Sequence, residues 1–208
     1  NEDSMLFHTM SRLGPEATKL LEGKYAAWLK QKGRNTPAKL IPIWKLVEDP
    51  GKPDDQAKAD LVQFYAETMR DFNAMMVQFF KDLGCKQLVN AGNWKPGDIT
   101  KLGDAERWSY TAADIIGVNR YVNGGTTQGG HVDPSGQGRS GYQINVGDLY
   151  ADESATVFPR KIAYNLKQVA GYPMMVYESC WVPPMSKQSE GPFLIAAYGS
   201  LSGVDSLY

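Results

Sequence analysis

Glu178 is the residue with the clearest chemical potential in this sequence. It ends an apolar run, residues 173–178, which follows a Gly-Tyr-Pro turn and predicts a short strand buried on both faces. Tyr177 and Trp181 flank the carboxylate. A carboxylate walled by aromatic side chains costs desolvation energy unless a partner or a substrate uses its charge. Glu178 is therefore either a functional carboxylate or an ordinary surface glutamate, and this stretch favours neither reading.

Polar and aromatic residues also stand at or after the ends of the predicted strands. They are Asn93, Trp94, Asn119, Tyr121 and Trp181. Because the carboxyl ends of parallel strands meet at one edge, we expect these residues to gather with Glu178 on one face. The aromatic members offer flat apolar faces of the kind that stack on sugar rings, and packing against their neighbours is an equal alternative.

Helices and strands alternate along the chain that must position these residues. The sequence predicts helices from Pro15 to about Gly33 and over residues 56–83, 104–113, 158–170 and 189–201. It predicts strands over residues 85–91, 114–119, 173–178 and from 203 to the end. This alternation is typical of parallel β/α architecture. The polar strand ends favour a (β/α)8 barrel over a doubly wound sheet, since no phosphate-binding turn follows a strand.

Two of the predicted helices carry further signals. Asp104 is a candidate cap for the helix over residues 104–113. The helix over residues 56–83 has one apolar face, made by Leu61, Phe64, Tyr65, Phe72, Met76, Phe79, Phe80 and Leu83. We therefore expect this long helix to pack along its whole length.

A long loop at residues 122–157 is rich in Gly, Ser, Asn and Asp. Loops of this length without structure of their own tend to be functional, so we expect it to wall a binding cleft. His131 within it is either a substrate contact or a solvated loop histidine. Residues 136–141 match the spacing G-x-G-x-x-G, but no strand precedes them and no helix follows. We therefore predict no nucleotide cofactor.

Composition narrows the class of protein. The 208 residues are 42% hydrophobic and 22% charged with a formal net charge of -1, which is typical of a globular chain with a sizeable core. No basic run suggests nucleic acid, and no apolar run is long enough to span a membrane. Cys85 and Cys180 make no metal-type spacing. Asp133, Asp148 and Asp152 miss the calcium pattern of an EF-hand, so we predict no metal.

Four short motifs, taken in order, resemble those of clan A glycoside hydrolases, the cellulase, mannanase and β-galactosidase group. They are Asn1-Glu2, Gly92-Asn93-Trp94, Asn119-Arg120-Tyr121 and Glu178-Ser179-Cys180-Trp181. The resemblance implies a (β/α)8 fold, here a partial barrel from about the fourth strand to the eighth in a single domain over residues 1–208. It implies an extracellular or periplasmic enzyme without cofactors that acts on an oligo- or polysaccharide.

The resemblance also implies roles for individual residues. Glu2 would be the acid/base, Glu178 the nucleophile, Asn1 a contact to the sugar 2-hydroxyl, and Tyr121 the residue that orients Glu178. Asn93, Trp94, Asn119, His131 and Trp181 would be further substrate contacts. Independently of the family, hydrolysis with retention requires two carboxyl groups about 5–5.5 Å apart, which two glutamates at neighbouring strand ends can provide.

Two other functions remain open. The chain could bind carbohydrate without cleaving it, because a fold does not prove an activity. It could also be a metal-assisted hydrolase, although no His/Asp cluster supports that. We expect the chain to be part of a longer protein, whose preceding half barrel is the missing partner and without which it is inactive.

Overall fold

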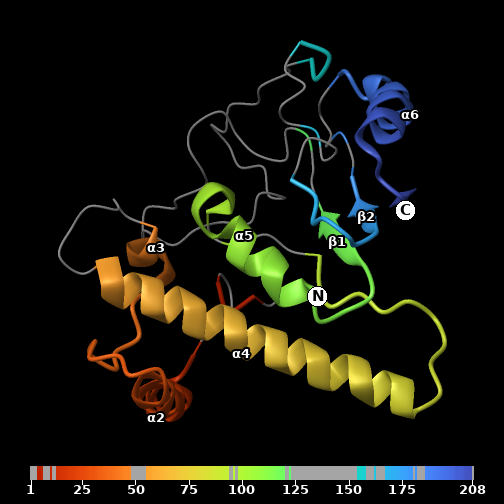
Figure 1. Cartoon of the computed structure of the whole chain (residues 1–208). Coiled ribbons are helices and arrows are strands. Elements are labelled where there is room, and N and C mark those ends of the chain that lie inside the picture. Colours follow the sequence, from red (N-terminus) through yellow and green to blue (C-terminus); the bar gives the residue numbers. More distant parts are fainter. Residues whose placement is uncertain are drawn as a thin grey trace. The chain divides into compact units, whose positions relative to one another are not determined.

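The computed structural model describes residues 4–6, 10, 13–47, 55–93, 96, 98–119, 122, 154–157, 162, 167–179, 181 and 186–207. Over these residues it contains five helices, α2 to α6, and three strands, β1 to β3 (Figure 1). The chain divides into two compact units. The first comprises Asn1–Gly117 with Val169–Pro173, and the second comprises Val118–Gln168 with Met174–Tyr208. Among the described helices, none is both long and apolar enough to cross a bilayer.

The two longest helices of the first unit begin and end where the sequence predicts. Helix α2 (Pro15–Gln31) starts with a proline, whose missing N–H would have no helical partner at that position. Just beyond its last residue, Gly33 has a φ of 65° and lets the N–H of Arg34 reach the carbonyl of Leu29 at 2.9 Å. Helix α4 (Asp55–Asp82) ends in the same way before Gly84, whose φ is 91°.

Helix α5 (Ile99–Tyr110) begins earlier than predicted. Asp98 caps it, because one carboxylate oxygen accepts from the N–H groups of Thr100 at 2.8 Å and Lys101 at 3.0 Å. Asp104, the predicted cap, lies inside the helix, and that prediction is wrong. Both aspartates precede helix-compatible residues, and Asp98 caps because the helix already begins at Ile99.

The core of the first unit is built on α2, the short α3 (Ile43–Leu46) and the first half of α4. Its largest buried side chains include Tyr25, Trp28, Leu61, Phe64 and Tyr65. The Tyr25 and Phe64 rings lie 5.0 Å apart between centroids. The second half of α4 differs, because Phe72, Phe79, Phe80 and Leu83 are 43 to 70% exposed. The predicted apolar face therefore packs along only part of its length.

The three strands form one small sheet in the order β1-β2-β3. Strands β1 (Ile116–Asn119) and β2 (Met174–Glu178) come from predicted runs, and β3 (Ser206–Leu207) pairs parallel to β2 with Met175 opposite Ser206. In the core of the second unit, Val118, Met174, Val176 and Trp181 pack with Leu194 of α6 (Glu190–Ser202).

The predicted partial (β/α)8 barrel is wrong for the chain that the structure describes. The described chain has five helices and three strands, the strands make one small parallel sheet, and nothing in this part of the chain closes into a barrel. The predicted strand over residues 85–91 makes only an isolated bridge, between Asn90 and Ile115. In the first unit the long helices pack on one another instead, with α4 alongside α5 (Figure 1). Short apolar runs predict strands but leave the partners of those strands undetermined.

Candidate functional site at the carboxyl ends of β1 and β2

Glu178 is the last residue of β2, and its side chain is exposed. Alternate residues of a strand point to the same face, so Glu178 continues the row that Met174 and Val176 begin. Those two side chains are buried, with 1% and 0% of their surface exposed. The apolar row fixes the strand in the core, and the carboxylate that follows it stands at the sheet's end. The strand therefore holds Glu178 in place without burying its charge.

Asn119 ends the neighbouring strand β1 and is buried. Because the sheet is parallel, the ends of β1 and β2 lie at the same edge. The two segments stay together beyond the strands, since Val122 and Trp181 form an isolated parallel bridge. This brings Asn119 and Glu178 to one edge of the second unit, together with Trp181.

Trp181 packs within the second unit. Only 5% of its surface is exposed, and it belongs to the core with Val176 and Leu194. Gly191, near the start of α6, lies so close that a β-carbon there would be 2.9 Å from Cε3 of the tryptophan. The indole ring therefore serves as packing in this unit, and its buried N–H has no partner among the described residues.

Three polar atoms at this edge are buried without a hydrogen-bond partner among the described residues: Asn119 Oδ1, Ser179 Oγ and Trp181 Nε1. Buried polar groups are nearly always paired with protein, water or ligand. The three atoms comprise an acceptor, a hydroxyl that both donates and accepts, and a donor. A polyhydroxylated ligand can satisfy such a mixed set, and Glu178 stands beside it. Ser179 is not predicted from the sequence, where its only signal is its position after Glu178.

The remaining predicted site residues are placed differently. Asn93 is buried in the first unit, and its Oδ1 also has no described partner. Five others lie outside the described residues, namely Asn1, Glu2, Trp94, Tyr121 and His131. The same holds for most of the loop over residues 122–157. Of the predicted set, the structure therefore brings Asn119, Glu178 and Trp181 together.

The first unit contains a buried carboxyl group that is not predicted from the sequence. Glu106 of α5 is 1% exposed. It accepts from Ser4 Oγ at 2.5 Å and from Tyr110 Oη at 2.6 Å. Burial raises the pKa of Glu106, and these two hydrogen bonds oppose the rise only in part. The spacing of four residues between Glu106 and Tyr110 was the available clue, because such residues are neighbours on a helix.

No protein-family model, curated protein or solved structure matches this chain. Within the described ranges, no group of three or more histidine, cysteine, aspartate or glutamate side chains is arranged to hold a metal ion.

Proposed function

We propose that this chain hydrolyses β-linked glycans or glycosides with retention of configuration, with Glu178 as the nucleophile and Glu2 as the acid/base. The observation that supports this most is the exposed carboxylate at the shared edge of β1 and β2, beside three buried polar atoms without described partners. Ligand sites of open parallel sheets lie at the carboxyl ends of the strands. The proposal therefore rests on this edge and does not require a barrel.

The reaction takes place in two steps. A Glu178 oxygen attacks the anomeric carbon while the bond to the leaving oxygen breaks, and Glu2 gives that oxygen its proton. The product is a glycosyl ester on Glu178. Glu2, now ionised, then takes a proton from water, which attacks the same carbon and releases the sugar and the Glu178 carboxylate. Asn119, Ser179 and Trp181 would supply hydrogen bonds to the sugar hydroxyls.

Covalent trapping tests the proposal. The reagents are dinitrophenyl 2-deoxy-2-fluoroglycosides of the gluco, galacto, manno and xylo series. A retaining enzyme forms the glycosyl ester from them quickly, and the fluorinated ester is then hydrolysed slowly. We expect at least one of them to add a single fluoroglycosyl group to the peptide that contains Glu178, as seen by mass spectrometry after proteolysis. Glu178→Gln should abolish labelling, whereas Glu16→Gln, the same change at an exposed residue of α2, should leave it intact. Labelling of another residue, or of none, contradicts the proposal.

Carbohydrate binding without cleavage is the second candidate. It is favoured by the polar atoms of the edge that have no partner among the described residues, because binding needs only such atoms, whereas hydrolysis needs a second carboxyl group as well. A glycan array separates the two functions. If the chain is an enzyme, the Glu178→Gln variant should bind sugars without cleaving them, and the unchanged chain should cleave them. A binding protein should retain its glycans in both forms and release no product.

A further inference from the structure

The second half of α4 exposes a continuous row of apolar side chains. The large apolar residues of this row, each 43 to 70% exposed, are Phe72, Met75, Phe79, Phe80 and Leu83. Residues three or four positions apart are neighbours on a helix, and the Phe79 and Phe80 rings lie 5.9 Å apart between centroids. We call these five residues, together with the half-buried Met76, the α4 stripe.

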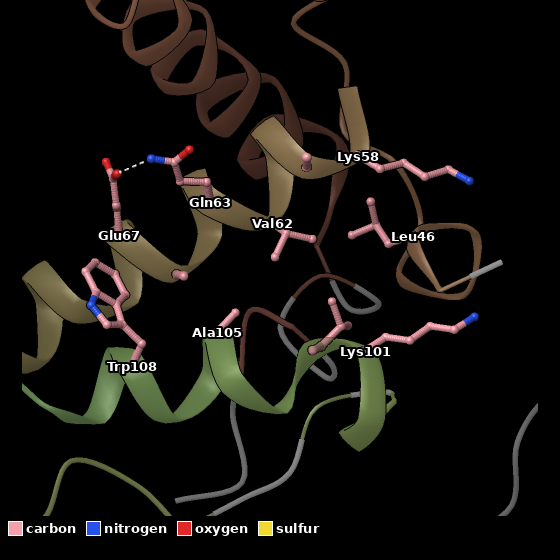
Figure 2. Close-up of a pocket in the computed structure, with 11 residues that line it drawn as sticks. Leu46, Lys58, Val62, Gln63, Glu67, Lys101, Ala105 and Trp108 are labelled. Atoms are coloured by element: carbon pink, nitrogen blue, oxygen red, sulfur yellow. Dashed lines mark hydrogen bonds between the residues drawn. The ribbon is translucent and has the colours of Figure 1, made fainter. Parts of the chain in front are cut away.

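The first half of the same helix is covered by other parts of the first unit. Glu67 accepts from Trp28 Nε1 at 2.7 Å, so α2 reaches this point of α4. On another side α5 runs alongside α4 as far as Trp108, with a groove of about 750 Å³ between the two helices (Figure 2). Near the end of α5, the Asn73 amide donates to the carbonyl of Ser109 at 3.1 Å. Beyond this point the apolar side chains are exposed, so the cover ends where the α4 stripe begins.

The exposed area of the α4 stripe is large enough to form an interface. A side chain of this size has roughly 200 Å² of surface, so the exposed fractions amount to about 550 Å². That is near the upper limit for a single apolar patch on a monomer. Two such stripes that face each other remove about 1,100 Å² from water, and a specific interface needs about 1,000 Å². A second copy of this chain therefore suffices to cover the stripe.

The spacing within the stripe fits a pair of helices. Phe72, Met76, Phe79 and Leu83 follow one another at intervals of four, three and four residues, which is the pattern by which two α-helices interlock. We consider two α4 helices that run antiparallel about a two-fold axis midway between Met76 and Phe79. Phe72 of each copy then lies level with Leu83 of the other, and Met76 lies level with Phe79. Every residue of this seam therefore meets an apolar residue.

Charge also favours the antiparallel direction. The exposed Asp71 and Asp82 flank the stripe. In a parallel pair each aspartate would lie level with the same aspartate of the other copy, and like charges that face each other oppose association. In the antiparallel pair Asp71 lies level with Gly84, and Asp82 lies level with Asn73. Since α4 ends at Asp82, the second helix also stops before the part of α4 that α2 covers.

We propose that the α4 stripe is the contact surface of a homodimer in which the second halves of two α4 helices pack antiparallel. The same patch serves both copies, as a two-fold symmetric contact requires. The dimer covers the part of the apolar face of α4 that α2 and α5 leave exposed. The proposal concerns the first unit and is independent of the function proposed for the β1–β2 edge.

Sedimentation equilibrium over submicromolar to submillimolar concentrations tests the dimer. We expect a monomer–dimer equilibrium with a micromolar dissociation constant, because the contact is near the lower size limit of specific interfaces. Phe79→Glu should raise this constant at least about a hundredfold, since two apolar rings leave the contact and two like charges enter it. Leu20→Glu makes the same kind of change at an exposed residue of α2 and should leave the constant unchanged. Circular dichroism should show the same helix content in both variants, because both positions are exposed.

Three outcomes overturn the proposal. A chain that stays monomeric at every concentration would assign the stripe to a different occupant. Oligomers that grow beyond the dimer would show unspecific association of the apolar surface. Dimerisation that Phe79→Glu leaves unchanged would place the contact elsewhere on the chain.

Disulfide cross-linking tests the direction of the two helices. In a background of Cys85→Ser with Cys180→Ser, one preparation carries Phe72→Cys and a second carries Leu83→Cys. The antiparallel pair brings these two positions together, so the mixture should form a disulfide between them under mild oxidation. Each preparation alone should cross-link far less, because its own two cysteines lie about 17 Å apart along the helix axis. A mixture without the mixed disulfide, or efficient cross-linking of each preparation with itself, overturns the antiparallel contact.

Discussion

Replacing Glu106 with glutamine should change how stability depends on pH. Burial raises the pKa of this carboxyl group in the folded chain. In the unfolded chain it titrates near its ordinary value of about 4.3. Between these two pKa values the folded state binds one more proton than the unfolded state. The free energy of unfolding therefore falls as pH rises through this interval, by about 1.4 kcal/mol per pH unit. The stabilisation that the neutral carboxyl group contributes is fully present below the pKa of the unfolded chain. It is lost as pH rises through the pKa of the folded chain.

Glu106→Gln keeps a neutral side chain of the same shape at every pH. Ser4 Oγ and Tyr110 Oη, which lie 2.5 and 2.6 Å from the carboxyl oxygens, are hydroxyls that can donate or accept, so they can pair with the amide. The variant should therefore lack the fall in unfolding free energy that Glu106 causes as pH rises. The difference in unfolding free energy, variant minus unchanged chain, should rise by about 1.4 kcal/mol per pH unit through the interval and then level off.

Urea unfolding followed by circular dichroism, from about pH 4 to about pH 8, measures this difference. All other titrating groups are common to both chains and largely cancel. Glu16→Gln removes an exposed carboxylate of α2, and its difference should not rise in this way. A Glu106→Gln difference that stays constant or falls with pH would show that the buried carboxyl is ionised without penalty, and would refute the reasoning.

Three further substitutions should lower the free energy of unfolding in the same assay. Asp98→Ala removes the side-chain cap of α5 and should cost about 1 kcal/mol, with Asp98→Asn close to neutral; equal losses would discount the cap. Leu61→Ala empties a fully buried position and should cost about 2–5 kcal/mol, whereas Leu20→Ala at an exposed position should cost far less. Gly191→Ala puts a β-carbon 2.9 Å from Trp181 and should cost about 1–3 kcal/mol; a neutral result would mean that the indole can shift freely.

The sequence predicts the long helices well because their signals are local. Pro15 and Gly33 bracket α2, and Gly84 follows α4, so backbone preferences mark the ends. The apolar face of α4 was predicted as one surface, yet only its first half is covered. Periodicity shows which residues share a face, whereas the extent of the covering elements depends on the whole fold.

The sequence alone does not exclude the barrel, because a short apolar run predicts a strand without showing which strands it pairs with. The run at residues 85–91 has strand-like composition but contributes only the Asn90–Ile115 bridge. Asn119 and Glu178 come to one edge because two neighbouring parallel strands end there, and this does not need a barrel. The groove between α4 and α5 and the Ser4–Glu106 contact depend on residues about 40 to 100 positions apart, as Lys58 and Lys101 or Ser4 and Glu106 illustrate.

Two carboxyl groups in this protein differ in their surroundings, because Glu106 is buried and Glu178 is exposed. A perturbed pKa is often used to find active sites, and by that criterion Glu106 would be chosen. Its oxygens are nevertheless closed off by Ser4 and Tyr110, and at 1% exposure no substrate can reach them. Glu178 is exposed at the end of a strand that the core holds in place, beside buried polar atoms without described partners. Access therefore makes Glu178 the better candidate, and the group with the raised pKa serves the fold.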